Sequence, residues 1–230
     1  YPTNYEIENS CRFDGTSALT SPAFSSAVTT FTVSLWLKRC RLKTGTYDLE
    51  GVFTVVDNGG GTKSSYNFNN AQKLNIYDNT GSDATSTGNI IYRDLSAWYQ
   101  IVIVSNSGTV SFYKNGVLDF TDDRVSTTFA STDKAVLGGY STGSDLFAGY
   151  IADVNFVDGQ ALDPTYFAHS HPSTGRWSPK RYQGTYGTNG FHLEFKSNGY
   201  QTGLGGIGED TSGNGNHFVL NAGLTAHDIV

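Results

Sequence analysis

Charged residues are scarce in this chain of 230 residues, making up 16% of it, against about 25% in an average soluble domain. The net charge is −6 and no basic patch stands out, which argues against duplex nucleic acid as a partner. The longest purely apolar run, residues 101–104, is far shorter than the roughly 20 residues that span a bilayer, so we expect no membrane insertion. Methionine is absent, and we expect that an initiator or a longer N-terminus has been removed or is missing before Tyr1.

Cysteine is almost as rare, with only Cys11 and Cys40 in the chain. A disulfide between them is one interpretation, and two small unpaired thiols, buried or half-buried, is the interpretation we favour. The cysteines therefore do not indicate an oxidising compartment.

What is abundant is typical of β-structure and turns: 27 Gly, 14 Tyr and 14 Phe. No stretch shows a sustained helical stripe of apolar residues. A chain of this length forms a single large all-β domain in many sandwich folds, and it can bury a sizeable core without disulfides.

Residues 98–118, WYQIVIVSNSGTVSFYKNGVL, contain the clearest local pattern. Strict alternation over residues 99–104, with β-branched side chains on both faces, predicts a strand inside a sheet. Two turns follow, at residues 106–108 and at Asn115-Gly116, the second of a composition suited to a type I′ turn. The stretch therefore predicts an antiparallel meander.

Alternating or β-rich segments predict further strands, at residues 31–38, 51–57, 66–68, 74–77, 135–137, 147–157 and 190–195. In the segment 147–157 we expect one face to carry Tyr150, Ala152, Val154 and Phe156. Residues 78–88 are polar and predict a loop. Asp163 followed by Pro164 predicts one helical turn, and residues 210–218 predict a Gly/Asn loop that enters a last strand.

Six phrases follow one another in the order expected of laminin-G-like domains: SCRFDGTSALTSP, FTVSLWLKR, WYQIVIV, TVSFYKNGVL, AVLGGY and FAGYIADVNFVDGQAL. Over residues 10–168 the chain resembles these domains, which are concanavalin A-like jelly rolls. The resemblance implies an all-β fold, an antiparallel β-sandwich jelly roll. We expect residues 1–230 to form one such domain, with its core in 10–168 and with 169–230 as a C-terminal excursion that folds back onto it.

The second half is similar to a narrower group, carried by GYIADVNFVDGQALDPTYF, TGRWSPKRYQGTYGTNGFHLEF and DTSGNGNHF. These phrases resemble bacteriophage virion proteins of the marine and cyanophage type. The resemblance implies a surface-exposed structural protein of the virion, a tail fibre, spike or capsid decoration. Expected partners are other virion proteins and further copies of the chain, with host-surface glycans as a ligand class.

The order of these phrases is also unusual for laminin-G-like domains, in which a strand such as FHLEF followed by SGNGNH usually opens the domain. Here both come last. We therefore expect residues 190–195 to join the same sandwich, as in a circular permutation.

Some jelly rolls of this superfamily are glucanases, and glycoside hydrolysis needs two carboxylates roughly 5–10 Å apart. The five glutamates are Glu6, Glu8, Glu50, Glu194 and Glu209. Only Glu6 and Glu8 alternate along one segment, close to the N-terminus. No G-x-S-x-G motif is present either. We therefore expect no enzymatic activity and name no catalytic residues.

Metal binding has two candidate sets. His169 and His171 form an H-x-H pair of the kind that binds a transition metal in some trimeric phage spikes, although we favour two loop histidines before Pro172. Because laminin-G-like domains often bind calcium, placement near strand ends makes candidates of Asp57, Asp78, Asp83, Asp145 and Asp153. No dense ligand spacing singles out a set, and we expect Asp153 to bond the backbone of its own strand. No cofactor or metal site is assigned.

The aromatic residues are the candidates for sugar stacking. Trp36, Trp98 and Trp177 lie within the family-like phrases, so we expect them to pack in the fold. Tyr66, Tyr140 and Tyr186 adjoin glycine-rich turns, which favours exposure, but they define no binding site.

The resemblance thus predicts a non-enzymatic virion structural protein, with glycan binding in attachment as its accompanying role. Two alternatives stay open: a secreted or cell-surface carbohydrate-binding adhesin, and a polysaccharide-active enzyme of the jelly-roll class.

Overall fold

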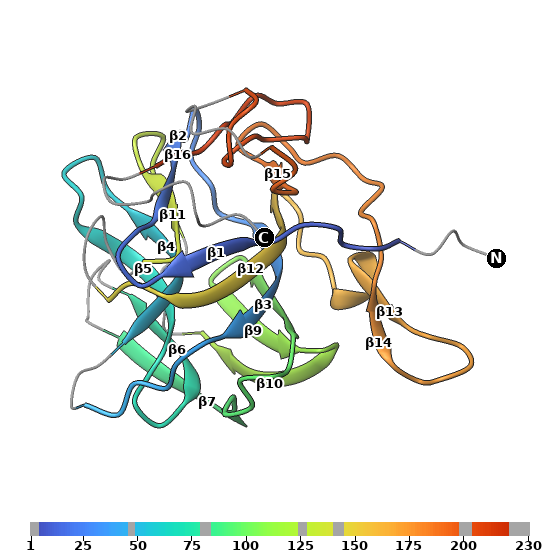
Figure 1. The fold of residues 1–230 in the computed structure, drawn as a ribbon. Coiled ribbons are helices and arrows are strands. Elements are labelled where there is room, and N and C mark those ends of the chain that lie inside the picture. The colour runs from blue at the N-terminus through green and yellow to red at the C-terminus, as the bar shows by residue number, and fades with distance from the viewer. Residues whose placement is uncertain are drawn as a thin grey trace.

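The structure is a computed structural model that describes residues 5–45, 49–78, 84–123, 128–139, 145–197 and 204–220. Two antiparallel sheets pack face to face, and a small hairpin projects from one side of them (Figure 1). No helix in these ranges is long and apolar enough to cross a membrane. The all-β jelly-roll prediction is confirmed.

The first sheet has the order β1-β12-β3-β8-β9-β10, with β15 also paired to β12. Its described strands are β1 (Cys11–Asp14), β3 (Phe31–Arg39), β8 (Tyr99–Asn106), β9 (Thr109–Lys114), β10 (Val117–Asp122), β12 (Ala148–Asp158) and β15 (Phe191–Leu193). The second sheet has the order β16-β2-β11-β4-β5-β6-β7. Its described strands are β2 (Leu19–Ala23), β4 (Glu50–Val56), β5 (Thr62–Phe68), β6 (Lys73–Asp78), β7 (Ala84–Ile91), β11 (Lys134–Leu137) and β16 (Val219–Leu220).

The predicted meander is present as β8, β9 and β10. β8 lies between β3 and β9, as its two apolar faces require. Asn115 and Gly116 both have positive φ, 47° and 79°, and the residues on either side of them pair directly. These features confirm the type I′ turn and the antiparallel order.

The predicted face of the segment 147–157 was wrong, because a bulge interrupts β12. The register with β3 shifts between Ala152 and Asn155, and Asp153 has a φ of +48°. A bulge moves the following side chains to the opposite face. Ile151, Val154 and Phe156 therefore point into the core, whereas Ala152 packs on the outer side of the sheet.

The same bulge marks the point where β12 changes partner along one edge. β1 pairs with Ala148–Ile151, and β15 pairs further on, from Val154 to Phe156. Residues 190–195 thus contribute a strand to the first sheet, as predicted. β16 adds the chain's last described strand to β2 in the second sheet, while the boundary drawn between 168 and 169 stays a prediction.

Phe156 lies at the centre of the core between the sheets. Its ring centroid lies 5.1 to 6.0 Å from those of four other phenylalanines, contributed by both sheets and by the C-terminal strand: Phe24, Phe31, Phe53 and Phe191. Aromatic rings at this spacing contribute packing beyond the area they bury. The C-terminal segment is therefore part of the central packing of the sandwich.

The loop predicted at residues 78–88 was wrong at both ends, because Asp78 belongs to β6 and β7 begins at Ala84; residues 79–83 lie outside the described residues. The polar residues at the start of β7 form a strand because their backbone pairs with β6. The free edge of β7 then meets β10: one oxygen of Asp119 accepts hydrogen bonds from the backbone N–H groups of Asn89, at 2.7 Å, and Ile90, at 2.9 Å. The two sheets are joined at this edge by a side chain.

A buried ion pair joins the sheets at another place. The Arg39 guanidinium donates to Glu50 Oε2 at 2.5 Å, and both side chains are 0% exposed. Arg39 also donates to the carbonyl oxygen of Tyr92 at 2.9 Å and lies 4.3 Å from the ring centroid of Phe68. Arg41 donates to the other carboxylate oxygen, Glu50 Oε1, at 2.8 Å. Glu50 is thereby shared between one buried and one half-exposed arginine.

The segment that follows β12 packs over part of the outer side of the first sheet. It begins with the predicted helical turn, which is the 3-10 helix η1 (Pro164–Tyr166) capped by Asp163. The hairpin of β13 (Ala168–Ser170) and β14 (Trp177–Pro179) follows. Val157 of β12 packs against Leu162, Phe167 and Tyr182 in a small second core. The outer face of the first sheet is thus partly covered.

Candidate functional site

Large aromatic side chains gather on the outer face of the first sheet. In β3 the core takes Leu35 and Leu37, so period-2 alternation turns Trp36 outward. Trp98 immediately precedes β8 and is 39% exposed, and its ring lies 6.4 Å from that of Tyr150. The two rings are tilted by 54° relative to each other, and the exposed part of Trp98 offers a flat apolar ring face to solvent.

The hairpin β13–β14 is fixed to this face by Trp177. Its indole N–H donates to Gln100 Oε1 at 2.6 Å, and the buried Gln100 side chain donates in turn to Ser34 Oγ at 3.2 Å. The Trp177 ring also rests on the turn at Gly116, where a Cβ atom would lie 2.7 Å from Trp177 Cη2. Gly116 therefore serves both the turn and the close approach of the hairpin.

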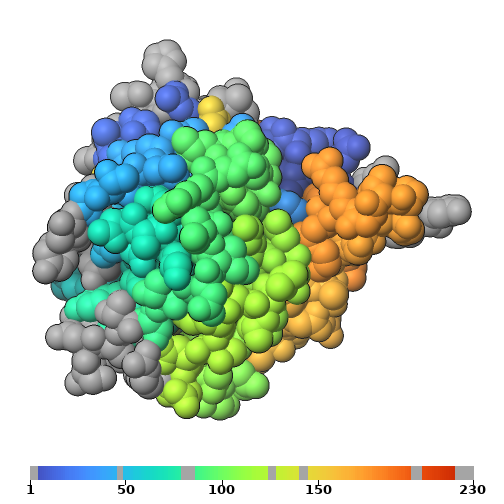
Figure 2. All heavy atoms as spheres, turned by 90° about the horizontal axis from the view of Figure 1, so that it is seen from below, coloured from blue at the N-terminus to red at the C-terminus, as the bar shows by residue number. Residues whose placement is uncertain are grey.

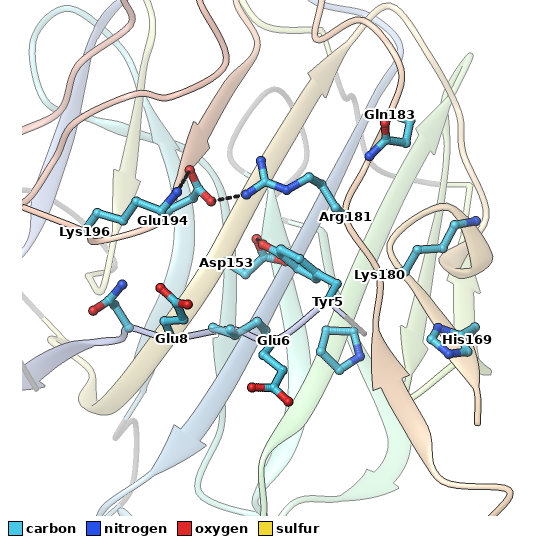
Figure 3. A pocket seen from close by; sticks show the side chains of 13 residues that line it. Tyr5, Glu6, Glu8, Asp153, His169, Lys180, Arg181, Gln183, Glu194 and Lys196 are labelled. Atoms are coloured by element: carbon cyan, nitrogen blue, oxygen red, sulfur yellow. Dashed lines mark hydrogen bonds and ion pairs between the residues drawn. The ribbon is translucent and has the colours of Figure 1, made fainter. Parts of the chain in front are cut away.

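Residues 5–10 cross the same face as an extended segment, which we name the strap. The Tyr5 hydroxyl donates to Asp153 Oδ1 at 2.8 Å, and the Arg181 guanidinium lies 5.2 Å from the Tyr5 ring centroid. Ile7 packs against the cluster that contains Trp36 and Ala152. Figure 3 shows Tyr5 over Asp153, with Glu6 and Glu8 further along the strap.

A groove runs on both sides of the strap. One part, of about 690 Å³, has Trp36, Trp98 and Ala152 among its lining residues, together with His169, His171 and Arg176 from the hairpin region. The other part, of about 880 Å³, is lined by Asp153, Lys180, Arg181, Glu194 and Lys196 among others. Residues 5–9 line both parts. Figure 2 shows the hairpin region, in orange, standing out beside the N-terminal segment, in dark blue.

The bulge at Asp153 forms a buried polar junction under the strap. Asp153 Oδ1 lies 2.8 Å from His192 Nε2 as well as accepting from Tyr5. Burial raises the pKa of the Tyr5 hydroxyl well above its usual value, and the nearby negative charge of Asp153 raises it further. The hydroxyl therefore stays protonated and acts as a donor. Asp153 therefore joins three separate segments: the strap, β12 and β15.

Glu194 is held by two cations. Its carboxylate accepts from Arg181 at 2.6 Å and from Lys196 at 2.9 Å (Figure 3). Burial alone would raise the pKa of Glu194, but the hydrogen bonds from Lys196 and Thr211 and the positive charge nearby outweigh it and lower the pKa. A carboxylate kept ionised in this way does not suit a general acid, which needs a raised pKa.

Comparison of the sequence with models of known protein families gives one match. The family model described as the concanavalin A-like lectin/glucanases superfamily matches residues 13–165. The chain belongs to this superfamily. The matched range ends before the hairpin β13–β14, so one wall of the groove is built from residues beyond it. A search of curated proteins found no match.

Solved structures share the fold of this superfamily member at low sequence identity. A heptameric SAP-like pentraxin from Limulus polyphemus is 20% identical with a TM-score of 0.55, covering 69% of this chain and 79% of its own. Domain 4 of the extracellular arabinanase AbnA from Geobacillus stearothermophilus, solved with arabinotriose, is 20% identical with a TM-score of 0.52, covering 71% and 76%. A putative carbohydrate binding protein from Bacteroides ovatus is 12% identical with a TM-score of 0.55, covering 96% and 60%.

The histidine pair and the strap glutamates all lie at the groove. His169 and His171 line it from the hairpin region, and Glu6 and Glu8 line it from the strap. Both pairs are visible in the sequence, but their proximity is not, because the strap and the hairpin are about 160 positions apart in the chain. Among the described residues, no group of three or more His, Cys, Asp or Glu side chains is arranged to hold a metal ion.

The calcium candidates do not converge. Asp57 accepts from the backbone N–H groups of Gly59 and Gly61 in its own loop, and Asp145 lies 3.7 Å from Lys43 Nζ. Asp78 is buried at the end of β6, and Asp83 lies outside the described residues. The prediction that Asp153 bonds only its own strand was wrong, since its carboxylate bonds Tyr5 and His192.

Some of the predictions for the aromatic residues are confirmed and others are wrong. Trp36 and Trp177 pack as expected, whereas Trp98 was wrongly expected to be packed. Tyr66 is fully buried in the core, which contradicts its expected exposure. Tyr186 is half-buried and stacks on His192 with a centroid distance of 5.8 Å; Tyr140 lies outside the described residues.

Cys11 and Cys40 do not form a disulfide with each other. Cys11 is buried, in line with the interpretation we favoured, whereas Cys40 is exposed rather than buried or half-buried.

Proposed function

We propose that the chain is a non-catalytic glycan-binding protein whose site is the groove on the outer face of the first sheet. The observation that carries the proposal is Trp98, more than a third exposed beside a groove whose walls bear hydrogen-bonding side chains. The apolar face of a sugar ring stacks on such a surface, while its hydroxyl groups bond polar neighbours. Ligand pockets combine a mainly apolar floor with a few polar groups in this way.

The polar groups of the groove come from opposite walls. Glu6 and Glu8 of the strap offer acceptors, and Arg176 and His171 on the hairpin side offer donors. An uncharged or mixed polyhydroxylated ligand matches such a lining better than a strongly charged one. The similarity to the putative carbohydrate binding protein from Bacteroides ovatus and to the arabinanase domain solved with arabinotriose supports the same ligand class.

The absence of catalysis is part of the proposal. Each of the two buried carboxylates at the groove is already engaged, Asp153 by Tyr5 and His192 and Glu194 by Arg181 and Lys196. A glycosidase needs one carboxyl as proton donor and a second as base or nucleophile. The remaining pair, Glu6 and Glu8, is exposed on the strap, without the burial that raises a carboxyl pKa.

We further propose that this glycan-binding protein is a surface component of a bacteriophage virion. The support is the resemblance of the phrases between residues 149 and 218, which include the helical turn η1 and the strands β14 and β15. In this setting the chain assembles with other virion proteins and with copies of itself, and the groove serves attachment. Symmetric assembly is the usual arrangement for repeated subunits.

The test is a glycan array probed with the purified chain, followed by electron microscopy of source particles labelled with an antibody against it. We expect binding to a defined set of oligosaccharides, no shortening of those oligosaccharides on prolonged incubation, and label on the virion surface. Binding without label on any particle would favour the adhesin. Cleavage of the bound glycan would refute the non-catalytic assignment.

A further inference from the structure

Trp36 carries a buried polar atom without a partner. Its side chain is only 8% exposed, and among the described residues its indole N–H has no hydrogen-bond acceptor. Trp177, which packs in the same cluster, has its own N–H bonded to Gln100. Because leaving a buried donor unpaired is costly, such a group calls for an explanation, and an unfilled ligand position is one.

The strap is part of what covers Trp36. Ile7 packs against the cluster of Trp36, Ala152 and Ala168 from the solvent side. Within the described part of the chain, no backbone hydrogen bond joins residues 5–9 to the sheet or to the hairpin. Residues 5–9 of the strap are therefore held chiefly by the side chain of Ile7 and by the Tyr5 hydroxyl on Asp153.

The groove lies on both sides of the strap, so the strap crosses a hollow that extends beyond it. Trp98 lies open in the same hollow as Trp36. Since Trp36 is paired with Gln100 across β3 and β8, Trp98 is its diagonal neighbour on the same face, at a spacing of about 7–8 Å. The two indoles thus form adjacent platforms, one open and one covered.

We propose that Trp36 forms a second sugar subsite that the strap occupies in the free protein, and that a bound oligosaccharide displaces Ile7 from it. This inference rests on the proposed glycan-binding function. In the bound state one sugar ring lies on Trp98 and the next lies on Trp36, whose N–H donates to a hydroxyl oxygen. Asp153 keeps its bond to His192 when Tyr5 leaves, so no buried carboxylate is left unpaired.

The ligand class follows from the two platforms. A monosaccharide uses Trp98 alone and leaves the strap in place, whereas a chain of two or more sugar units reaches Trp36. Weakening the hold of the strap therefore raises affinity for an oligosaccharide and leaves affinity for its monosaccharide unchanged.

The experiment uses the full chain labelled with ¹⁵N and the tightest-binding oligosaccharide from the array. The three indole N–H signals are assigned with Trp36→Phe, Trp98→Phe and Trp177→Phe. The test variant is Ile7→Ser, and its matched control is Ile91→Ser, whose isoleucine is 47% exposed on β7. Affinity and the hydrogen-exchange rate of each indole are measured with the oligosaccharide and with its monosaccharide.

We expect Ile7→Ser to speed exchange of the Trp36 N–H in the free protein and to raise oligosaccharide affinity roughly tenfold, the scale of one buried aliphatic side chain. Ile91→Ser should stay within twofold of the unchanged chain. Saturating oligosaccharide should shift the Trp36 signal, and Trp36→Phe should abolish the gain.

Two failures are distinguishable. Oligosaccharide binding that needs Trp98 but is unaffected by Ile7→Ser and Trp36→Phe would overturn the covered subsite and leave the proposed function standing. A lack of any binding that depends on Trp98 would defeat the proposed function, and the subsite with it.

Discussion

Removing Glu50 tests whether the buried ion pair between the sheets acts as one unit. In Glu50→Leu the Arg39 guanidinium keeps its bond to the Tyr92 carbonyl oxygen and its contact with Phe68, but its charge is left buried without a counter-ion. Loss of one partner from a buried pair costs about 3–5 kcal/mol. That is a large part of the about 5–15 kcal/mol by which a domain is stable.

The double variant Arg39→Met/Glu50→Leu separates two explanations of that loss. It leaves no charge buried, because Arg41, the other partner of Glu50, is 38% exposed and can turn to solvent. We expect it to be more stable than Glu50→Leu by at least about 2 kcal/mol, since apolar replacement of a whole buried pair is often close to neutral.

Urea unfolding followed by tryptophan fluorescence measures both values, and calorimetry checks them. At about 2–4 °C per kcal/mol for a chain of this length, Glu50→Leu should lower the Tm by about 6–20 °C. A loss below about 1 kcal/mol, or a double variant no more stable than Glu50→Leu, would refute the reasoning.

Three further predictions concern single contacts. Asp119→Ala leaves the backbone N–H groups of Asn89 and Ile90 without their acceptor, and should cost about 1.5–3 kcal/mol in urea unfolding; an unchanged midpoint would contradict the joining of β7 to β10. Gly116→Ala combines a φ of +79° with a clash against Trp177, and should cost about 1–3 kcal/mol and move the Trp177 indole signal; an unmoved signal would count against the packing described. Glu194 has a pKa below its ordinary 4.5, so the stability that its charge contributes is present above that pH and is lost as the pH falls through the lower folded value. Calorimetry should show Glu194→Gln less stable than the unchanged chain above about pH 5 and equal to it in strong acid, and a gap that persists in acid would argue against this origin.

Much of the fold follows from local pattern. The alternation of residues 99–104 and the Asn115-Gly116 turn predict β8, β9 and β10 correctly, because side-chain period and turn chemistry act over a few residues. The bulge at Asp153 is not predictable in the same way. It depends on β1 and β15 meeting along one edge of β12, a long-range arrangement that no local pattern encodes.

The candidate site is less predictable for a similar reason. Trp36 on the outward face of β3 follows from alternation, and the H-x-H pair is visible in the sequence. Their common groove depends on the strap and on the hairpin that Trp177 fixes to Gln100, and these contacts span up to about 160 positions. The phrase that contains Trp98 is typical of core strands and predicts packing. The exposure of Trp98 depends instead on which segments cover the outer face of the sheet, and these segments are distant in the sequence.

Glycan binding in this groove is tested most directly by isothermal titration of the array-selected oligosaccharide into Trp98→Ala. The matched control is Tyr166→Ala, which removes an aromatic side chain that is 47% exposed on η1, outside the lining of the groove. We predict that Trp98→Ala weakens binding by about tenfold or more, as removal of an aromatic anchor does, and that Tyr166→Ala changes it less than twofold. Equal affinity of Trp98→Ala and the unchanged chain would contradict the assignment of the groove as the binding site.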